Sequence, residues 1–177
     1  EDRYIIGFEE SYGYLTGSYV RDKDAVDGSL MICEMFAYYK THGQSLLDVL
    51  NGLYAKYGYC LNTLHSYEFE GAEGFAKMQG IMETFRNDCP AGWVGRKILS
   101  VSDYRESVTR YADGSKVDID LPKSNVLKYQ LEGNLSVVVR PSGTEPKLKM
   151  YFSVSAENRD KAQEMEKEFV AEVEKML

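Results

Sequence analysis

Residues 140–147, Arg-Pro-Ser-Gly-Thr-Glu-Pro-Lys, gather in one short loop the side chains that can hold an oxyanion. Ser142 and Thr144 supply hydroxyl donors, and Arg140 supplies a planar cationic fork that suits the edge of a phosphate. Gly143 can adopt the positive-φ conformation that turns consecutive backbone N–H groups toward one point. The same residues could form an ordinary loop between strands in which Arg140 is a solvated charge. The residue types alone leave both interpretations open.

A second polar loop near the start of the chain, Gly7-Phe-Glu-Glu-Ser-Tyr-Gly-Tyr14, could recognise a sugar. Glu9 can accept hydrogen bonds from sugar hydroxyls, and Ser11 can donate to them. Two solvated glutamates in a polar loop are the alternative interpretation. The charged segment Arg21-Asp-Lys-Asp24 follows. It fits either a ligand site or a helix entry, because acidic residues are favourable near a helix N-terminus.

The composition argues against several other classes of function. Acidic residues outnumber basic ones and the formal charge is −7, which disfavours a nucleic-acid surface and means that a bound phosphate must be attracted by local groups. No apolar run approaches the roughly 20 residues of a membrane span. The two histidines have no partner at metal-ligand spacing. Three widely spaced cysteines, Cys33, Cys60 and Cys89, indicate reduced thiols in a cytoplasmic protein.

The strands on either side of the first loop must position it. Alternating apolar residues predict strands over 127–131 and 135–139, joined by a two-residue turn at Gly133-Asn134. This hairpin delivers Arg140 to the loop, and a further strand over 148–154 carries the chain away. A loop held between two well-anchored strands gains precision from them.

The rest of the chain from about residue 66 completes an α+β domain. Apolar residues at helical spacing predict one helix from Phe75 to Phe85 and another from Ala162 to Met176. Further strands are expected over 67–70, 98–104 and 117–121. The other residues of the polar stretch 106–125 are expected to form loops. Runs of antiparallel strands with one helix before and one after indicate the α+β class.

Residues 1–60 are expected to form a short strand and a pair of helices. Tyr4-Ile-Ile6 predicts the strand, which leads into the Glu9 loop. Helices are predicted over 25–39 and 46–57, and their apolar positions must pack on something. Residues 59–66 then read as a linker into the second domain.

Both loops resemble ligand-binding loops of one enzyme family. Residues 140–147, followed by Leu148-Lys-Met-Tyr151, resemble the phosphate-binding loop in the last domain of the phosphohexomutases, which comprise phosphoglucomutase, phosphomannomutase and their relatives. Residues 7–14 resemble the sugar-recognition loop of the family's third domain. Tyr12-Gly13 stands where many relatives have Gly-His, which is more similar to the glucose-type, bacterial phosphoglucomutase branch. The two motifs occur in the family's order, so the resemblance covers essentially the whole chain.

The resemblance implies a role for each candidate residue. Four residues would bind the phosphate that is not transferred: Arg140, Ser142, Gly143 and Thr144. Two would bind the sugar, Glu9 and Ser11, and two more would lie near the substrate, Lys23 and Arg21. Glu10 fills the variable position of the sugar motif. No catalytic residue and no metal ligand of the family matches this chain.

The resemblance also implies a fold and an activity. Residues 1–60 would be the C-terminal part of mutase domain 3. Residues 66–177 would be mutase domain 4, a TATA-binding-protein-like antiparallel sheet with helices on one face. The complete enzyme would interconvert hexose 1-phosphate and hexose 6-phosphate through a bisphosphate intermediate, using a phosphoserine in its first domain and magnesium in its second.

The sequence contains neither a Thr-Ala-Ser-His-Asn-like serine loop nor an Asp-x-Asp-x-Asp magnesium loop. We therefore expect a fragment that is inactive alone and whose partners are a hexose phosphate and the missing N-terminal domains of the same polypeptide. Mg²⁺ and a glucose 1,6-bisphosphate-type activator would act in the complete enzyme. No nucleic-acid or membrane partner is expected. The alternative is a stand-alone phosphosugar-binding or regulatory module without catalysis.

Overall fold

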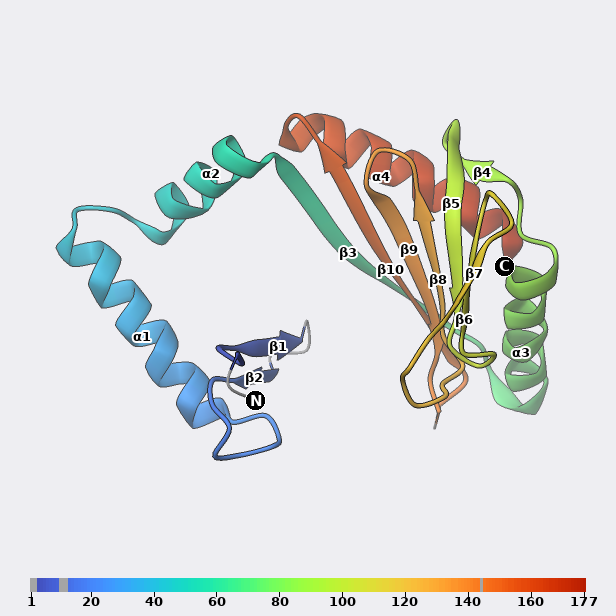
Figure 1. Cartoon of the computed structure of the whole chain (residues 1–177), viewed down its shortest axis with the longest axis horizontal. Coiled ribbons are helices and arrows are strands. Elements are labelled where there is room, and N and C mark those ends of the chain that lie inside the picture. Colours follow the sequence, from blue (N-terminus) through green and yellow to red (C-terminus); the bar gives the residue numbers. More distant parts are fainter. Residues whose placement is uncertain (1–2, 10–12, 144) are drawn as a thin grey trace. The chain divides into compact units, whose positions relative to one another are not determined.

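The computed structural model describes residues 3–9, 13–143 and 145–177, apart from the side chain of residue 72 (Figure 1). The chain divides into two compact units, unit 1 over Glu1–Lys56 and unit 2 over Tyr57–Leu177. Each unit is described by itself.

Unit 1 contains a two-stranded antiparallel ribbon of β1 (Gly7–Glu9) and β2 (Gly13–Leu15), followed by α1 (Ala25–Thr41) and α2 (Leu46–Tyr57). The first strand begins three residues later than the predicted Tyr4-Ile-Ile6, because Gly7 to Glu9 pair with β2 and residues 4–6 do not. Asp24 caps α1 by accepting from the backbone N–H groups of Val26 and Asp27. Both predicted helices are present, and each extends over at least its predicted range.

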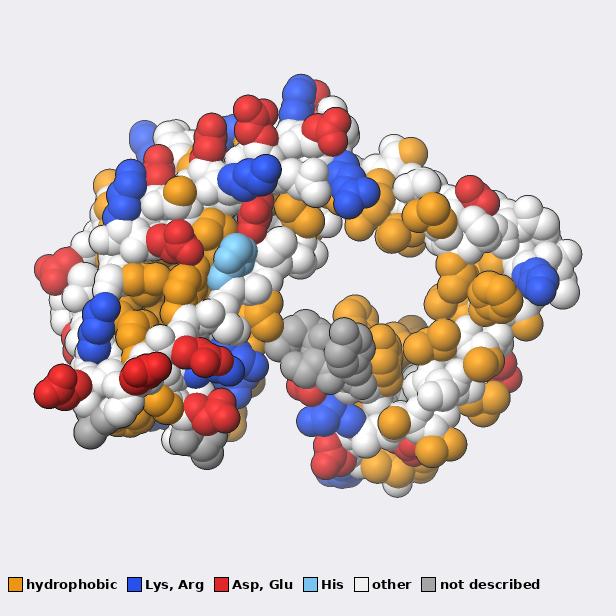
Figure 2. Space-filling model, turned by 180° about the vertical axis from the view of Figure 1, so that it is seen from behind, with side chains coloured by type: hydrophobic (Ala, Val, Ile, Leu, Met, Phe, Trp, Pro, Cys, Tyr) orange, Lys and Arg blue, Asp and Glu red, His pale blue; other side chains and the backbone are white. Residues whose placement is uncertain are grey.

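The apolar side chains of α1 and α2 are largely exposed within this chain. Val26 is 82% exposed and Leu30 58%, and the only buried residue in α1 is Gly28. In α2, Leu47 and Leu50 are likewise exposed. Figure 2 shows hydrophobic side chains spread over the surface of these helices. Among the described residues of unit 1, the apolar positions that predicted these helices are therefore not buried in a core.

Unit 2 is built on an antiparallel sheet whose strands follow the order β3-β10-β9-β8-β5-β6-β7, with β4 paired to β5. The bounds are β3 (Tyr59–Glu68), β4 (Gly92–Trp93), β5 (Arg96–Asp103), β6 (Val108–Tyr111), β7 (Lys116–Asp118), β8 (Leu127–Leu131), β9 (Leu135–Pro141) and β10 (Lys147–Ala156). Helix α3 (Gly71–Asn87) lies between β3 and β4 in sequence, and α4 (Arg159–Val173) follows β10 and runs into a 3₁₀ turn, η1 (Glu174–Met176). Figure 1 shows α4 crossing behind the strands.

One face of the sheet packs against both helices and forms the core. Alternate residues of the three central strands are buried there: Leu127, Tyr129, Leu131, Leu135, Val137, Val139, Leu148, Met150, Phe152 and Val154. Phe169 of α4 stacks edge-on against Phe152, and the Tyr129 hydroxyl donates to the backbone carbonyl oxygen of Phe85 in α3 at 2.7 Å. The predicted α+β class, an antiparallel sheet with helices on one face, is confirmed. The opposite face of the sheet, called the open face below, carries the other residues of these three strands, most of which are polar.

The strand predicted over 117–121 is the shorter β7 (Lys116–Asp118), and β4 was not predicted. Two other stretches differ more from the prediction. Residues 59–66, interpreted as a linker, belong to the ten-residue strand β3. Its helix-facing positions include Thr63 and His65, which both hydrogen-bond to Glu166 of α4. Because these inward residues are polar, the sequence of β3 does not show the apolar–polar alternation of a strand. The second is β6, which forms within the stretch expected to be loops. In addition, the hairpin turn spans three residues, because Leu131 pairs with Leu135.

Candidate functional site

The predicted phosphate loop joins the end of β9 (Pro141) to the start of β10 (Lys147). Arg140 pairs with Lys149 across the two strands, next to the pair formed by Val139 and Met150. Val139 and Met150 are fully buried on the helix side, so Arg140 and Lys149 project from the other side. Within the described part of the chain, neither cation has an acidic partner at ion-pair distance. Two cations thus stand together on the open face at the entrance to the loop.

A third cation continues this group. Lys128 of β8 pairs with Val138 of β9, so its side chain lies on the open face diagonally across from Arg140. We call Lys128, Arg140 and Lys149 the cationic strip. Of these three residues only Arg140 was predicted from the sequence, although Lys128 and Lys149 both occupy outward positions of predicted strands. That alternation was the available signal, but it does not say which outward residues become neighbours.

Internal hydrogen bonds hold the loop in a tight turn. The Ser142 N–H donates to the backbone oxygen of Lys147 at 2.7 Å, and the Lys147 N–H donates to the oxygen of Glu145 at 2.8 Å. The Ser142 hydroxyl oxygen accepts from the Glu145 N–H at 3.3 Å. In this conformation the Ser142 N–H is therefore engaged within the loop and does not point to a ligand.

Gly143 does not adopt the positive-φ conformation expected of it. The hydrogen bonds of Ser142 and Lys147 close the turn without it. A Cβ atom placed at residue 143 would meet no atom within 4 Å, so the space beside this backbone is open. Thr144, the fourth predicted residue of the loop, lies outside the described residues.

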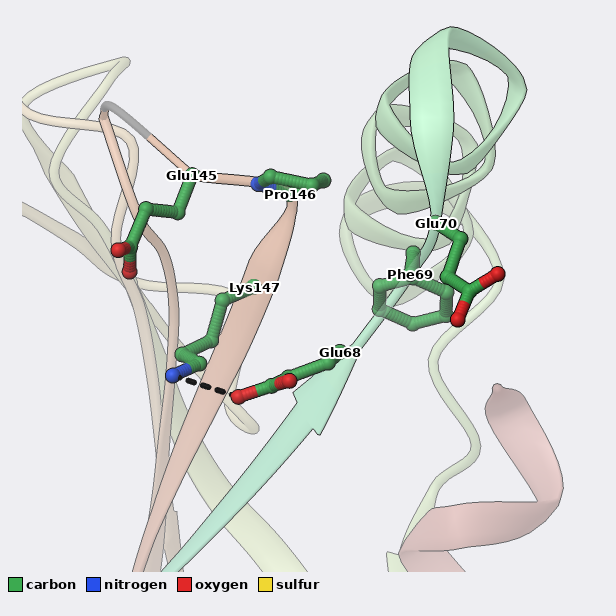
Figure 3. A pocket seen from close by; sticks show the side chains of 6 residues that line it. All are labelled: Glu68, Phe69, Glu70, Glu145, Pro146 and Lys147. Atoms are coloured by element: carbon green, nitrogen blue, oxygen red, sulfur yellow. Dashed lines mark ion pairs between the residues drawn. The ribbon is translucent and has the colours of Figure 1, made fainter.

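Strand β3 holds the far end of the loop. The ammonium of Lys147 lies 2.7 Å from a carboxylate oxygen of Glu68, and the Phe69 N–H donates to the backbone oxygen of Pro146 at 2.9 Å. The hydrogen bond and the negative charge of Glu68 raise the pKa of Lys147, and the same hydrogen bond lowers the pKa of Glu68. Figure 3 shows the pair beside a hollow of about 250 Å³ that Glu70 and Glu145 also line.

In unit 1, two predicted residues are brought together. Glu9 ends β1, and one of its carboxylate oxygens lies 3.4 Å from the Lys23 ammonium. Gly13 of β2 makes this approach possible, because a Cβ atom at residue 13 would lie 2.1 Å from Cδ of Lys23 and 2.9 Å from Cγ of Glu9. A carboxylate and an ammonium side by side can accept from one sugar hydroxyl and donate to another.

The remaining predicted residues of unit 1 are only partly described. Ser11 and Glu10 lie outside the described residues. Arg21 is exposed and lines a separate hollow of about 390 Å³ together with Tyr4 and Leu15.

No metal centre is found among the described residues, since nowhere in them do three or more His, Cys, Asp or Glu side chains come together as potential ligands. The residues that the structure describes also include no helix with both the length and the apolar composition that a bilayer span requires.

Models of known protein families match both units. Residues 1–57 match the phosphoglucomutase/phosphomannomutase alpha/beta/alpha domain III, and residues 97–172 match the phosphoglucomutase/phosphomannomutase C-terminal domain. Together the two matches include most of the chain. The chain belongs to the phosphoglucomutase/phosphomannomutase family. The match to domain III ends at residue 57, where the structure divides the chain into its two units.

Individual relatives agree with this membership. The phosphoglucomutase of Staphylococcus epidermidis is 39% identical over 162 residues, which is 90% of this chain and 29% of that protein. The phosphoglucomutase of Staphylococcus aureus is 39% identical over 157 residues, or 88% of this chain and 28% of the relative. The chain thus spans less than a third of the length of these relatives.

The fold is also similar to a solved structure. The open form of the Paramecium phosphoglucomutase pp63/parafusin superposes with a TM-score of 0.59 at 17% identity, covering 94% of this chain and 29% of the other. At that identity the likeness concerns the fold alone.

Proposed function

We propose that this chain is the substrate-recognition part of a phosphoglucomutase that interconverts glucose 1-phosphate and glucose 6-phosphate. The single observation that supports the proposal best is the pairing of Arg140 with Lys149 beside the Ser142–Gly143 turn, in a chain of this family. A dianionic phosphate suits two adjacent cations without acidic partners among the described residues. Relatives named phosphoglucomutase favour glucose over mannose as the sugar.

In this proposal the two units divide the substrate between them. The Arg140 guanidinium would bind the phosphate that is not transferred, with Lys149 beside it, while the Ser142 hydroxyl and the loop backbone at residues 143 and 144 would complete the site. The open space beside Gly143 would let a phosphate oxygen approach the backbone. Glu9, Ser11 and Lys23 would bind the sugar hydroxyls, and Arg21 would lie near the substrate.

Recognition of this kind supports phosphoryl transfer by positioning. Binding energy at the unreactive phosphate and at the sugar holds the reacting hydroxyl in line with the phosphoryl donor. The phosphoserine that we infer as donor, the Mg²⁺ and the site of a glucose 1,6-bisphosphate-type activator would belong to other domains of the complete protein. Among the described residues no three His, Cys, Asp or Glu side chains come together, and we assign no step in this chain to the metal. Three free thiols favour a cytoplasmic location.

A stand-alone phosphosugar-binding module is not favoured. The chain matches two successive domains of one family. It also aligns with about 29% of the length of a relative named phosphoglucomutase.

Titration of the ¹⁵N-labelled 177-residue chain tests the proposal. Glucose 1-phosphate and inorganic phosphate should both shift the amide signals of Arg140, Ser142, Gly143 and Lys149 at millimolar concentrations. Glucose alone should leave these signals unchanged. Equal shifts from glucose and from glucose 1-phosphate, or no shift with either phosphate, would contradict the assignment of the loop.

A further inference from the structure

The end of strand β3 makes two contacts with one end of the phosphate loop, and the proposed function gives these contacts no role. Glu68 pairs with Lys147 through its carboxylate, and the next residue, Phe69, donates its N–H to Pro146. Strand β3 also pairs with β10 along its whole length, with Glu68 directly opposite Lys147. Figure 3 shows the dashed ion pair at the point where β10 leaves the loop. Two consecutive residues of β3 therefore hold two consecutive residues of the loop.

Lys147 connects this contact to the rest of the loop. Its backbone oxygen accepts from the Ser142 N–H, and its own N–H donates to Glu145. Its side chain is 27% exposed, whereas that of Glu68 is 74% exposed. A shift of Lys147 would therefore move both ends of the turn that contains Ser142 and Gly143.

The direction of the ion pair also matters for the charge at the site. The strand order β3-β10-β9 places Glu68 on one side of β10 and Arg140 on the other. The Lys147 ammonium is thus held toward Glu68, while Arg140 and Lys149 face the proposed phosphate. A negative charge this close to a phosphate site lowers the affinity for an anion unless it contributes something else.

We propose that Glu68 is a positioning residue for the phosphate loop: by pairing with Lys147 it fixes the turn in which Ser142 and Gly143 stand beside Arg140. This inference rests on the proposed function, because it assumes that the loop binds phosphate. The proposed effect of Glu68 on phosphate affinity is opposite in sign to the effect of its negative charge. Electrostatics alone makes removal of the carboxylate tighten phosphate binding, whereas positioning makes the same change weaken it.

Glu70 offers a matched control. It lines the same hollow two residues away and is exposed, and among the described residues it has no ion pair. Glu68→Gln and Glu70→Gln each remove one negative charge from the lining of the same hollow. In titrations of the 177-residue chain with inorganic phosphate, Glu68→Gln should raise the Kd about two- to fivefold, the range of an exposed ion pair. Glu70→Gln should leave the Kd unchanged or lower it.

A double-mutant cycle separates positioning from other effects. If Glu68 acts through Lys147, Glu68→Gln should have no further effect on the Kd in a Lys147→Met background. Amide exchange supplies a second readout: Glu68→Gln should accelerate exchange of the Ser142 and Phe69 amides, while the amide of Val137 in the core stays protected. Thermal melting of each variant confirms that unit 2 remains folded.

The outcomes are distinct. No phosphate binding by the unaltered chain would refute the proposed function and, with it, this inference. Binding by the unaltered chain that is equal or tighter in Glu68→Gln would refute the inference alone. An equal weakening in Glu68→Gln and Glu70→Gln, or an undiminished effect in the Lys147→Met background, would also refute it.

Discussion

Replacing Arg140 with alanine should separate phosphate binding from folding stability, because the two are expected to change in opposite directions. Arg140 faces Lys149 across β9 and β10, and no acidic partner accompanies them among the described residues. A charge-assisted hydrogen bond contributes roughly 1.5–3 kcal/mol, so Arg140→Ala should weaken phosphate binding about ten- to hundredfold.

The effect on stability follows from the same geometry. Side chains directly opposite each other on antiparallel strands lie about 5 Å apart at Cβ, and like charges there repel. At that separation in water the repulsion is at most about 0.8 kcal/mol. Arg140→Ala relieves it, so the free energy of unfolding should rise by up to this amount, less the small loss of packing by the arginine stem.

Phosphate titration followed by NMR measures the affinity, and urea denaturation measures the free energy of unfolding. Arg96→Ala is the matched control, because Arg96 is an exposed arginine of the same sheet near the end opposite the loop. Its phosphate affinity should stay within about twofold of that of the unaltered chain. An unchanged affinity in Arg140→Ala, or an equal loss in Arg96→Ala, would refute the assignment of the cationic strip to phosphate.

Three further predictions concern activity, the sugar loop and the core. The purified 177-residue chain should show no mutase turnover with glucose 1-phosphate and magnesium, because it matches only the third and C-terminal domains of the family; turnover that survives controls for host enzyme would contradict this. In the full-length enzyme, Glu9→Gln should lower kcat/KM about ten- to hundredfold with the 1-phosphate and the 6-phosphate alike, and Glu10→Gln should lower it far less. Equal losses of kcat/KM in the two variants would mean that the loop has a structural role and does not bind the sugar. Asp103 is 1% exposed and accepts a hydrogen bond from the Arg86 guanidinium at 2.7 Å. Asp103→Asn should therefore lower the free energy of unfolding by about 3–5 kcal/mol. A loss below about 1 kcal/mol in urea denaturation would contradict this. Burial is the largest single influence on the pKa of Asp103 and raises it, but the hydrogen bond and charge of Arg86 and the backbone N–H groups of Arg105 and Glu106 together outweigh burial and lower the pKa. The stabilisation is therefore present above about pH 4 and is lost as the pH falls further, and the unfolding free energy should fall less steeply with acid in Asp103→Asn than in the unaltered chain.

The sheet of unit 2 was predictable where its inward residues are all apolar. Leu127, Tyr129 and Leu131 alternate with polar residues and proved fully buried. The same rule failed for β3, because Thr63 and His65 occupy its inward positions and are satisfied by Glu166 on a helix about a hundred residues away. Periodicity detects apolar burial and cannot detect a polar side chain that is buried with its partner.

The candidate site divides in the same way. The Arg140 loop could be found from its residue types, since they lie together in the sequence. Lys149 and Glu68 could not, because their places beside the loop depend on the register of β10 with β9 and β3. The approach of Lys23 to Glu9 likewise depends on the absence of a side chain at Gly13. Such contacts between strands are set by tertiary pairing, about which spacing along one strand carries no information.

The pairing of β3 with β10 sets an order in which unit 2 can be completed during synthesis. Tyr59, at the start of the unit, lies beside Ala156, so β3 leaves the ribosome long before the strand that it pairs with. Until β10 arrives, β3 is an unpaired edge, and contacts of such long sequence separation form slowly. The phosphate loop lies at the start of β10 and is held by the end of β3, so it reaches its final shape only when this last pairing closes. Binding at the proposed phosphate site would therefore report that β3 and β10 have paired.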